Sequence, residues 1–428
     1  YEVAIRLLKL SDYQYYQLQL YLENYGTLSS IYELDGMDGF GQKERERLEQ
    51  LVDVAPAPEG SSFFKDFFKK GKSKLLVRYQ QILERQAGYD TSRATHYDGS
   101  PIRAMFRYSF ETQNRFSLKI SGEKDPGEQF FRGKQRYGFD FYSGSASIKD
   151  IGILKHAVIG DYRLNFGQRL VLGSSLLSGK GGSVESVRRF GTGIRAIAPT
   201  SEGDFLRGTA ITLGHTNAQG SLFAGRSFGS TNNALGADFS FRRKLFRIGA
   251  RFAAYSRTDT SGTSLAERFT SSWKPTSFNV GADYQAILFK HLIFGELAFN
   301  QDGALGLLQA AVFNITPILK IAAIFRHYGK RYTNPLGHAF GSNSQNAGET
   351  GLYLTGNYIL SRRITLDFFA DYYRLTKLTY RTDAPIQGLD LGISGLINLN
   401  RNSSLQLKYT FRDKPENNGE STYHKEIK

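Results

Sequence analysis

The stretch Ser404-Leu405-Gln406-Leu407-Lys408-Tyr409-Thr410-Phe411-Arg412 alternates apolar and polar side chains with a period of two. Leu405, Leu407 and Tyr409 fall on one face, and the polar side chains between them fall on the other. Such alternation is typical of a β-strand with one apolar and one polar face. The same unit, roughly ten alternating residues followed by a turn, recurs from about Leu75 to the end of the chain.

Carried over most of the 428 residues, this repeat predicts an all-β transmembrane barrel of about 18 antiparallel strands, within a range of roughly 16–20. Turn lengths support the prediction, because outer-membrane barrels have short turns on one side and long loops on the other. Short turns are expected near Asn114, Asp150, Asn217, Lys244, Lys290, Thr316, Arg362 and Arg401. Long loops are expected near Asp90, Asp125, Ser174–Glu202, Gly229, Gly262, Gly341, Asp383 and Asn417, with a short exception at Gln301–Gly303. The alternative, a soluble sandwich or propeller, does not explain these two classes of turn.

The composition agrees with a strand-rich membrane protein. The chain has 45 glycines and 10 prolines, which suit tight turns, and 32 phenylalanines and 25 tyrosines, which favour strands and membrane interfaces. It has no cysteine, so disulfides, thiolate metal sites and cysteine nucleophiles are excluded. A mean hydropathy of −0.38 is compatible with a barrel because half of each strand faces a polar interior.

Both ends of the chain predict a longer protein. The opening Tyr1-Glu2-Val3-Ala4-Ile5-Arg6 looks like the middle of a helix, with no signal peptide before it. The end, Tyr423–Lys428, lacks the final aromatic residue that is usual in outer-membrane barrels. We therefore expect residues beyond both ends, a strand or two among them, and infer export from the predicted barrel alone.

Three segments follow from these patterns. Residues 1–55 are predicted to form a small all-α domain, residues 56–74 a linker, and residues 75–428 the barrel. Within the linker, Phe63–Lys70 alternates aromatic pairs with charged pairs. This segment is interpreted either as an amphipathic helix at the membrane surface or as a loop packed under the barrel.

The charge is distributed unevenly between these segments. The formal net charge of the chain is +15, yet residues 1–55 hold five basic and ten acidic side chains. A basic protein normally indicates polyanionic partners such as nucleic acid or anionic lipid. In this chain the barrel carries the positive charge, and the helical domain is acidic.

The helical segment contains one recognisable motif. The stretch Leu34-Asp35-Gly36-Met37-Asp38-Gly39-Phe40-Gly41-Gln42-Lys43-Glu44-Arg45 resembles the hairpin of a helix-hairpin-helix domain. The preceding stretch, Leu18–Leu34, is similar to the matching part of ComEA-type competence DNA receptors. Together with the barrel, the motif resembles a family of helix-hairpin-helix outer-membrane proteins of Bacteroidota.

That resemblance implies a phosphate or partner contact at Gly39, Phe40 and Gly41, with Lys43 nearby. In the helix-hairpin-helix family the backbone N–H groups of the hairpin bind DNA phosphate at the start of a helix. Here the hairpin itself carries two aspartates, which weaken phosphate binding. A protein-interaction module is therefore favoured over DNA binding.

The short turns carry a group of basic side chains, which we call the basic rim. The domain precedes the first strand, so it falls on the side of the short turns, which face the periplasm in such barrels. We expect the acidic domain to dock there and partly close the barrel; alternatively, the rim is simply solvated or binds lipopolysaccharide phosphate. The rim comprises Arg115, Arg243, Lys244, Lys290, Arg362, Arg363 and Arg401.

The polar face of the strands predicts mixed charge inside the barrel, able to line a water-filled pore or to form ion-pair networks. The Ser174–Glu202 loop is interpreted either as an inward constriction or as a disordered external loop, with the external loop slightly favoured. The inward charges include Arg107, Glu111, Asp161, Arg163, Arg169, Arg251, Asp283, Glu296, Asp367 and Asp371.

Catalytic signatures are weak. The seven histidines lie outside any recognisable nucleophile motif, and no metal-ligand spacing or phosphate loop is found. We expect no catalytic residue, metal or cofactor. The predicted function is a non-enzymatic outer-membrane channel or a subunit of an export or assembly complex, with protein partners in the outer membrane or periplasm. Its membrane partners are outer-membrane lipid and lipopolysaccharide. A DNA-uptake protein is the alternative, and a surface enzyme is the third.

Overall fold

The structure is a computed structural model that describes the β-rich part of the chain and portions of the N-terminal segment. Several predicted features, namely the linker segment Phe63–Lys70, Gly39, Gly41, the Lys43 side chain, Arg362 and Arg401, lie outside it. The described residues are 8, 10, 14, 15, 17, 18, 31, 34, 37, 40, 42–51 and 71–427, with gaps at 85, 113–114, 134, 174–179, 181–183, 189–190, 202, 216, 228–232, 257–276, 344–345, 362, 378–384, 401–402 and 416–420.

A single antiparallel sheet contains all 19 described strands. The all-β prediction is therefore confirmed, and β1 begins at Gly71 rather than at residue 75. The strands are β1 (Gly71–Gln81), β2 (Ile102–Thr112), β3 (Phe116–Lys124), β4 (Phe141–Ile151), β5 (Leu154–Asn165), β6 (Gly193–Ala196), β7 (Leu206–Gly214), β8 (Ala218–Ser227), β9 (Asn233–Arg243), β10 (Phe246–Ser256), β11 (Ser277–Leu288), β12 (His291–Asn300), β13 (Leu305–Thr316), β14 (Leu319–Tyr328), β15 (Glu349–Ser361), β16 (Ile364–Leu375), β17 (Ile386–Asn400), β18 (Ser403–Pro415) and β19 (Ser421–Ile427).

Two of these strands, β6 and β7, both pair with β5. The short β6 pairs with the end of β5 at Tyr162–Asn165, and β7 pairs with β5 at Leu154–Tyr162. Because β6 is four residues long and pairs with β5 alone among the described strands, 18 longer strands make up the rest of the sheet. This agrees with the expectation of about 18 strands.

The predicted short turns that the structure describes, near Asp150, Asn217, Lys244, Lys290 and Thr316, lie at one end of the sheet. Each falls between two strands that pair directly with antiparallel register, as between Arg243 and Phe246. Gly71 at the start of β1 pairs with Thr112 at the end of β2, so the N-terminal segment enters at this short-turn end. The described parts of the long loops lie at the opposite end. The predicted asymmetry of the turns is confirmed.

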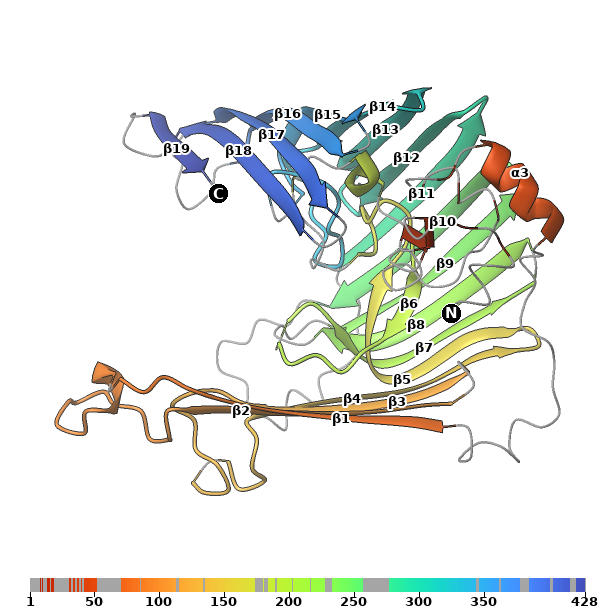
Figure 1. Ribbon diagram of the computed structural model, residues 1–428. Helices are drawn as coiled ribbons and strands as arrows, with labels where there is room; N and C mark the ends of the chain where they lie inside the picture. Colours follow the sequence, from red (N-terminus) through yellow and green to blue (C-terminus); the bar gives the residue numbers. More distant parts are fainter. Residues whose placement is uncertain are drawn as a thin grey trace.

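The sheet curls into an open arc rather than lying flat (Figure 1). Right-handed twist accumulating over many neighbouring strands favours such curling. The edges of the arc are β1 and β19, and no ladder joins them within the described part of the chain. The concave side of the arc is the inner face, and the convex side is the outer face.

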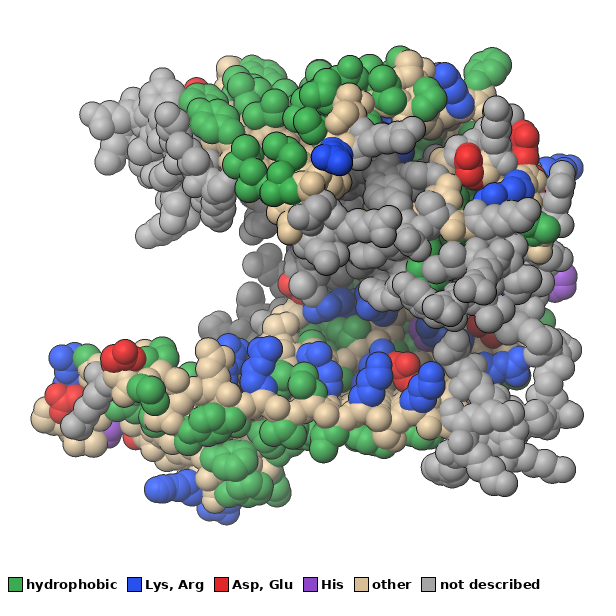
Figure 2. Space-filling view, viewed as in Figure 1, with side chains coloured by type: hydrophobic (Ala, Val, Ile, Leu, Met, Phe, Trp, Pro, Cys, Tyr) green, Lys and Arg blue, Asp and Glu red, His purple; other side chains and the backbone are tan. Residues whose placement is uncertain are grey.

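The outer face is apolar, as the alternation predicts. On β11, Phe278 and Val280 are 42% and 44% exposed, while Asn279 and Asp283 point inward and are 0% and 4% exposed. Exposed Leu, Ile, Phe and Tyr recur at such positions from β1 to β18, and apolar side chains cover much of the upper layer in Figure 2. A soluble protein rarely exposes so continuous an apolar surface.

The N-terminal segment has a small core of its own. Leu10, Leu34, Met37, Phe40 and Leu48 are buried together, and Leu48 belongs to the helix α3 (Gln42–Leu51). This helix falls inside the segment that is predicted to be helical, and in Figure 1 it lies at the short-turn end of the sheet. None of the helices that the structure describes is long and apolar enough to cross a membrane.

Candidate functional site: the inner face of the sheet

The described part of the long connection between β5 and β6, residues 166–192, folds onto the inner face. Leu170, Val171 and Leu172 are at most 1% exposed, and Val184 and Val187 are also buried. The preference for a disordered external loop is therefore wrong for the described part of this connection. Packing inside the arc removes these apolar side chains from water, which is favourable. We call residues 166–192 the β5–β6 loop.

A second long connection, residues 329–348 between β14 and β15, holds the β5–β6 loop in place. The Leu170 carbonyl accepts hydrogen bonds from the Tyr332 hydroxyl at 2.9 Å and from Asn334 Nδ2 at 2.6 Å. Asn334 Nδ2 also donates to the Val171 carbonyl at 2.8 Å, and the Gly173 N–H donates to the Leu336 carbonyl at 2.7 Å. We call residues 329–348 the β14–β15 loop.

The sheet itself anchors the β5–β6 loop through Glu296 on β12. Its Oε2 accepts hydrogen bonds from the backbone N–H groups of Gln168 at 2.6 Å and Leu170 at 3.1 Å. Its Oε1 accepts one from Arg251 Nη1 at 2.8 Å. One fully buried carboxylate thus joins the loop to the strands, and charge-assisted bonds of this kind are among the strongest in proteins.

Arg251 is the centre of a buried ion-pair network. Besides Glu296, its guanidinium contacts Asp238 at 3.0 Å and Asp283, and Asp283 also contacts Arg247 at 2.5 Å. The strand register explains the convergence, because Asp238 pairs with Arg251 and Asp283 pairs with Glu296. We call these five residues the Arg251 cluster. The cluster contains two guanidinium groups and three carboxylates.

Arg326 on β14 is the centre of a second network. It contacts Glu349 Oε1 at 2.5 Å and both carboxylate oxygens of Asp371, at 2.8 and 3.0 Å. Lys180, from the β5–β6 loop, lies 2.7 Å from Asp371 and also contacts Asp390. These five residues form the Arg326 cluster. The loop is therefore pinned electrostatically at two places on the inner face.

Apolar packing fills the space around the two clusters. Leu170, Val171 and Leu172 belong to one large core cluster with Phe294 and Leu308, inward residues of β12 and β13. The cluster also takes in Tyr332 and Phe340 of the β14–β15 loop. Over β7–β16 the described inner face is thus covered by folded loops.

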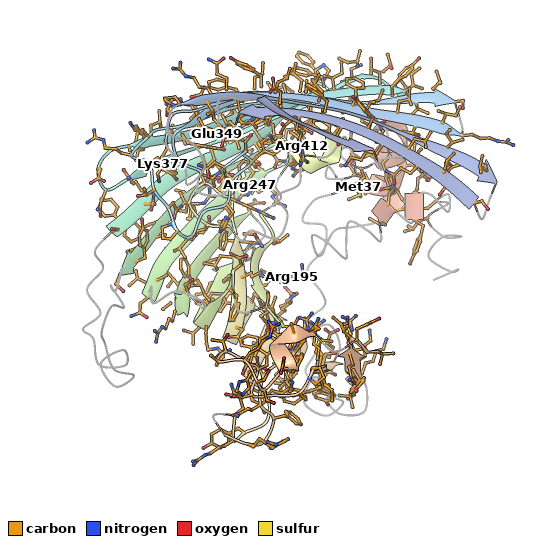
Figure 3. All side chains as sticks on the ribbon, turned by 90° about the vertical axis from the view of Figure 1, so that its left-hand side faces the viewer. Met37, Arg195, Arg247, Glu349, Lys377 and Arg412 are labelled. Atoms are coloured by element: carbon orange, nitrogen blue, oxygen red, sulfur yellow. The ribbon has the colours of Figure 1, made fainter. Side chains whose placement is uncertain are left out.

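The inner face over β1–β6 is different, because its positive side chains remain accessible. Figure 2 shows Lys and Arg side chains in a row along the inner surface of the lower layer, bordering a hollow. Arg107, Lys149 and Arg195 are exposed, and Lys119 keeps 31% of its side chain exposed. Figure 3 shows Arg195 on the inner side of the arc, below Arg247 and Glu349. We call Arg107, Lys119, Lys149 and Arg195 the basic wall.

The predicted inward charges fall into distinct environments. The structure brings Arg251, Asp283 and Glu296 together, and it places Asp371 against Arg326. Asp161 is buried and accepts hydrogen bonds from Arg207 at 2.6 and 2.9 Å.

The other predicted charges are more dispersed. Glu111 lies 3.9 Å from Lys119, Asp367 accepts a hydrogen bond from Asn357 at 2.8 Å, and the Arg163 guanidinium donates to the Asp204 carbonyl at 3.1 Å. Arg169 lies in the β5–β6 loop rather than on a strand, and it is 2% exposed.

The described members of the basic rim, Arg115, Arg243, Lys244, Lys290 and Arg363, all lie at the short-turn end, as their positions next to the short turns require. In the hairpin, the Phe40 side chain is buried in the small N-terminal core. Its N–H donates to the Met37 carbonyl at 3.3 Å.

Sequence reasoning missed Arg326, Glu349 and Lys180 as site residues. Arg326 had a usable signal, since it follows Ala322 and Ile324 in the inward phase of β14. Lys180 had no local signal, because its partners Asp371 and Asp390 lie about two hundred residues further along the chain. Among the described residues, no group of three or more His, Asp or Glu side chains is placed to hold a metal ion.

No protein-family model matches the chain, and no curated protein is similar to it. Among solved structures it is similar to Wzi of Escherichia coli, an outer-membrane protein involved in group 1 capsule assembly, at 11% identity and a TM-score of 0.44, over 92% of this chain and 89% of that one. It is similar to Pseudomonas aeruginosa OccK11 (OpdR) at 8% identity and a TM-score of 0.45, over 75% and 86%. A BenF-like porin from Pseudomonas fluorescens matches at 11% identity and a TM-score of 0.43, over 83% and 97%. At these values the likenesses assign neither a family nor a function to the chain.

Proposed function

We propose that this chain is a non-enzymatic β-barrel of the bacterial outer membrane that acts as a channel, alone or as a subunit of an export or assembly complex. The observation that carries the proposal is the contrast between the two faces of the sheet. Exposed apolar side chains recur along the outer face, and the buried Arg251 and Arg326 clusters lie on the inner face. A charged side chain facing lipid costs about 2–4 kcal/mol at the bilayer midplane, so this arrangement suits a membrane with a polar interior.

The inner face supports a narrow passage rather than a wide pore. The β5–β6 and β14–β15 loops cover the inner face over β7–β16, where the Arg251 and Arg326 clusters hold them. The basic wall lies on the part of the sheet that these loops leave accessible. Solutes would therefore pass along β1–β6.

The N-terminal segment is proposed to act at the short-turn end, in the periplasm, as a helix-hairpin-helix-like domain. It is acidic, it enters the sheet beside Thr112, and the basic rim lies at the same end. Opposite charges at one end favour docking of the segment against the mouth. The segment would then gate the passage or recruit a protein partner.

Planar-bilayer recording tests the proposal. We expect the full chain to give discrete steps of low conductance, and a variant lacking residues 1–60 to give larger or longer openings. Absence of any conductance from the folded full chain, judged by its heat-modifiable mobility, would refute the channel. Equal conductance of the two proteins would refute gating by the N-terminal segment and leave the channel in place.

A further inference from the structure

We propose that the basic wall is a binding site for solutes carrying two or more oxyanion groups, such as carboxylates or phosphates. The inference rests on the proposed channel, for which it names the class of solute. Its four cations come from four strands that are neighbours in the sheet or share β5 as a neighbour: Arg107 from β2, Lys119 from β3, Lys149 from β4 and Arg195 from β6.

The strand register brings Arg107 and Lys119 onto one surface. Lys119 pairs with Ser109 on one side and Ser145 on the other, and directly paired residues point to the same face of a sheet. Arg107 pairs with Ser121, one step further along β3 on the same face. Lys149 follows Ser145 at alternate positions of β4 and so shares its face, and Arg195 lies on the inner side of the arc (Figure 3).

The positive charge of the basic wall is barely neutralised. In the described part of the chain, its one ion pair is between Lys119 and Glu111, at a loose 3.9 Å. The Arg251 and Arg326 clusters instead have more carboxylates than cations. Keeping like charges together without partners is unfavourable, so a protein retains such a group where an anion compensates it.

Two buried side chains next to the cations, those of Ser145 and His156, each have one polar atom without a hydrogen-bond partner among the described residues. Ser145 is 4% exposed and His156 is 8% exposed, and neither Ser145 Oγ nor His156 Nε2 has a hydrogen-bond partner among the residues described. Ser145 pairs with Lys119, and His156 pairs with Lys149. Such unsatisfied atoms are rare and call for a ligand or water. A bound oxyanion would accept from the serine hydroxyl while contacting the lysines.

The spread of the basic wall argues for a ligand with several charges. Neighbouring strands lie about 4.8 Å apart, so the two spacings from β2 to β4 already cover roughly 10 Å, and Arg195 comes from β6, which pairs with the next strand, β5. A small single-charge ion contacts one or two of these cations at a time. A solute with two or three oxyanion groups reaches more of them, and its greater charge also offsets repulsion by Glu111.

Calorimetric titration of the folded full chain in detergent tests the site, with tripolyphosphate and citrate as probes and acetate as the single-charge control. We expect tripolyphosphate and citrate to bind at about 50 mM salt, acetate not to bind, and the affinity to fall as salt rises. The variant Lys119→Gln/Lys149→Gln should bind at least tenfold more weakly. The matched control Lys330→Gln/Arg331→Gln removes two exposed loop charges away from the wall and should bind like the parent.

Equal binding by the parent and by Lys119→Gln/Lys149→Gln, or no binding by the parent, overturns the site. If that double variant does not fold, Arg195→Gln takes its place with the same criteria. Bilayer recording separates the two proposals. Conductance without multivalent-anion binding leaves the channel and removes the site, whereas binding without conductance leaves the site and removes the channel.

Discussion

Gly167 lies directly against the guanidinium of Arg251. A Cβ atom at position 167 would lie 2.1 Å from Arg251 Nη1 and 2.8 Å from Glu296 Oε2. The backbone at Gly167 also has a φ of +53°, in the left-handed region that favours glycine. The β5–β6 loop can reach the Arg251 cluster because residue 167 has no side chain.

Substitution Gly167→Ala should therefore displace the β5–β6 loop. The left-handed backbone alone costs about 1–2 kcal/mol in an L-residue, and the contact with Arg251 adds to it. We expect a lower temperature for the heat-modifiable mobility shift and larger conductance steps. The control is Gly203→Ala, a loop position where an added Cβ would have no atom within 4 Å. Identical behaviour of the two variants would contradict the close approach.

Removal of the Arg251 guanidinium should destabilise the sheet. Arg251→Met leaves three buried carboxylates with less compensation, a change that typically costs about 3–5 kcal/mol. Urea unfolding in lipid vesicles measures the loss, with the exposed loop variant Arg136→Met as the control. Adding Glu296→Gln should cost less than the sum of the two single changes, because both remove the same contact. Additive costs would show that the two residues act independently.

Asn334 donates two of the hydrogen bonds that link the two loops. Asn334→Ala removes two hydrogen bonds to the Leu170 and Val171 carbonyls, each at most 2.8 Å long. Losing buried partners costs about 1–3 kcal/mol, so we expect faster hydrogen exchange at Gly173, whose N–H bonds across the same junction. Asn314→Ala, which removes an exposed bond to the Lys290 carbonyl, is the control and should leave this exchange unchanged. Unchanged exchange in Asn334→Ala would argue against the link.

The strands and turns were predictable because each depends on local sequence. The alternation at Phe278-Asn279-Val280 determines which side chains face out, and the lengths of the turns determine the ends of the sheet. The sequence did not decide the path of the inward loops, because an inward constriction was only the less favoured of two interpretations for Ser174–Glu202. Their anchors join residues far apart in the chain, such as the Gln168 N–H and Glu296, which are separated by 128 positions. A glycine-rich stretch containing Lys180 looks like an external loop until its carboxylate partners are known.

His338 makes the β14–β15 loop sensitive to pH. Burial and the nearby Arg169 lower the pKa of His338, while Asp204, with Oδ1 4.0 Å away, opposes them. The unfolded chain, with an ordinary histidine pKa of about 6.5, therefore binds a proton before the folded chain does. The free energy of unfolding should be retained above about pH 6.5 and decrease below it, by at most about 2 kcal/mol at pH 5. Urea unfolding at pH 8 and pH 5 measures this fall, and His338→Gln should show a smaller one. An equal fall in the parent and the variant would assign the pH dependence to other groups.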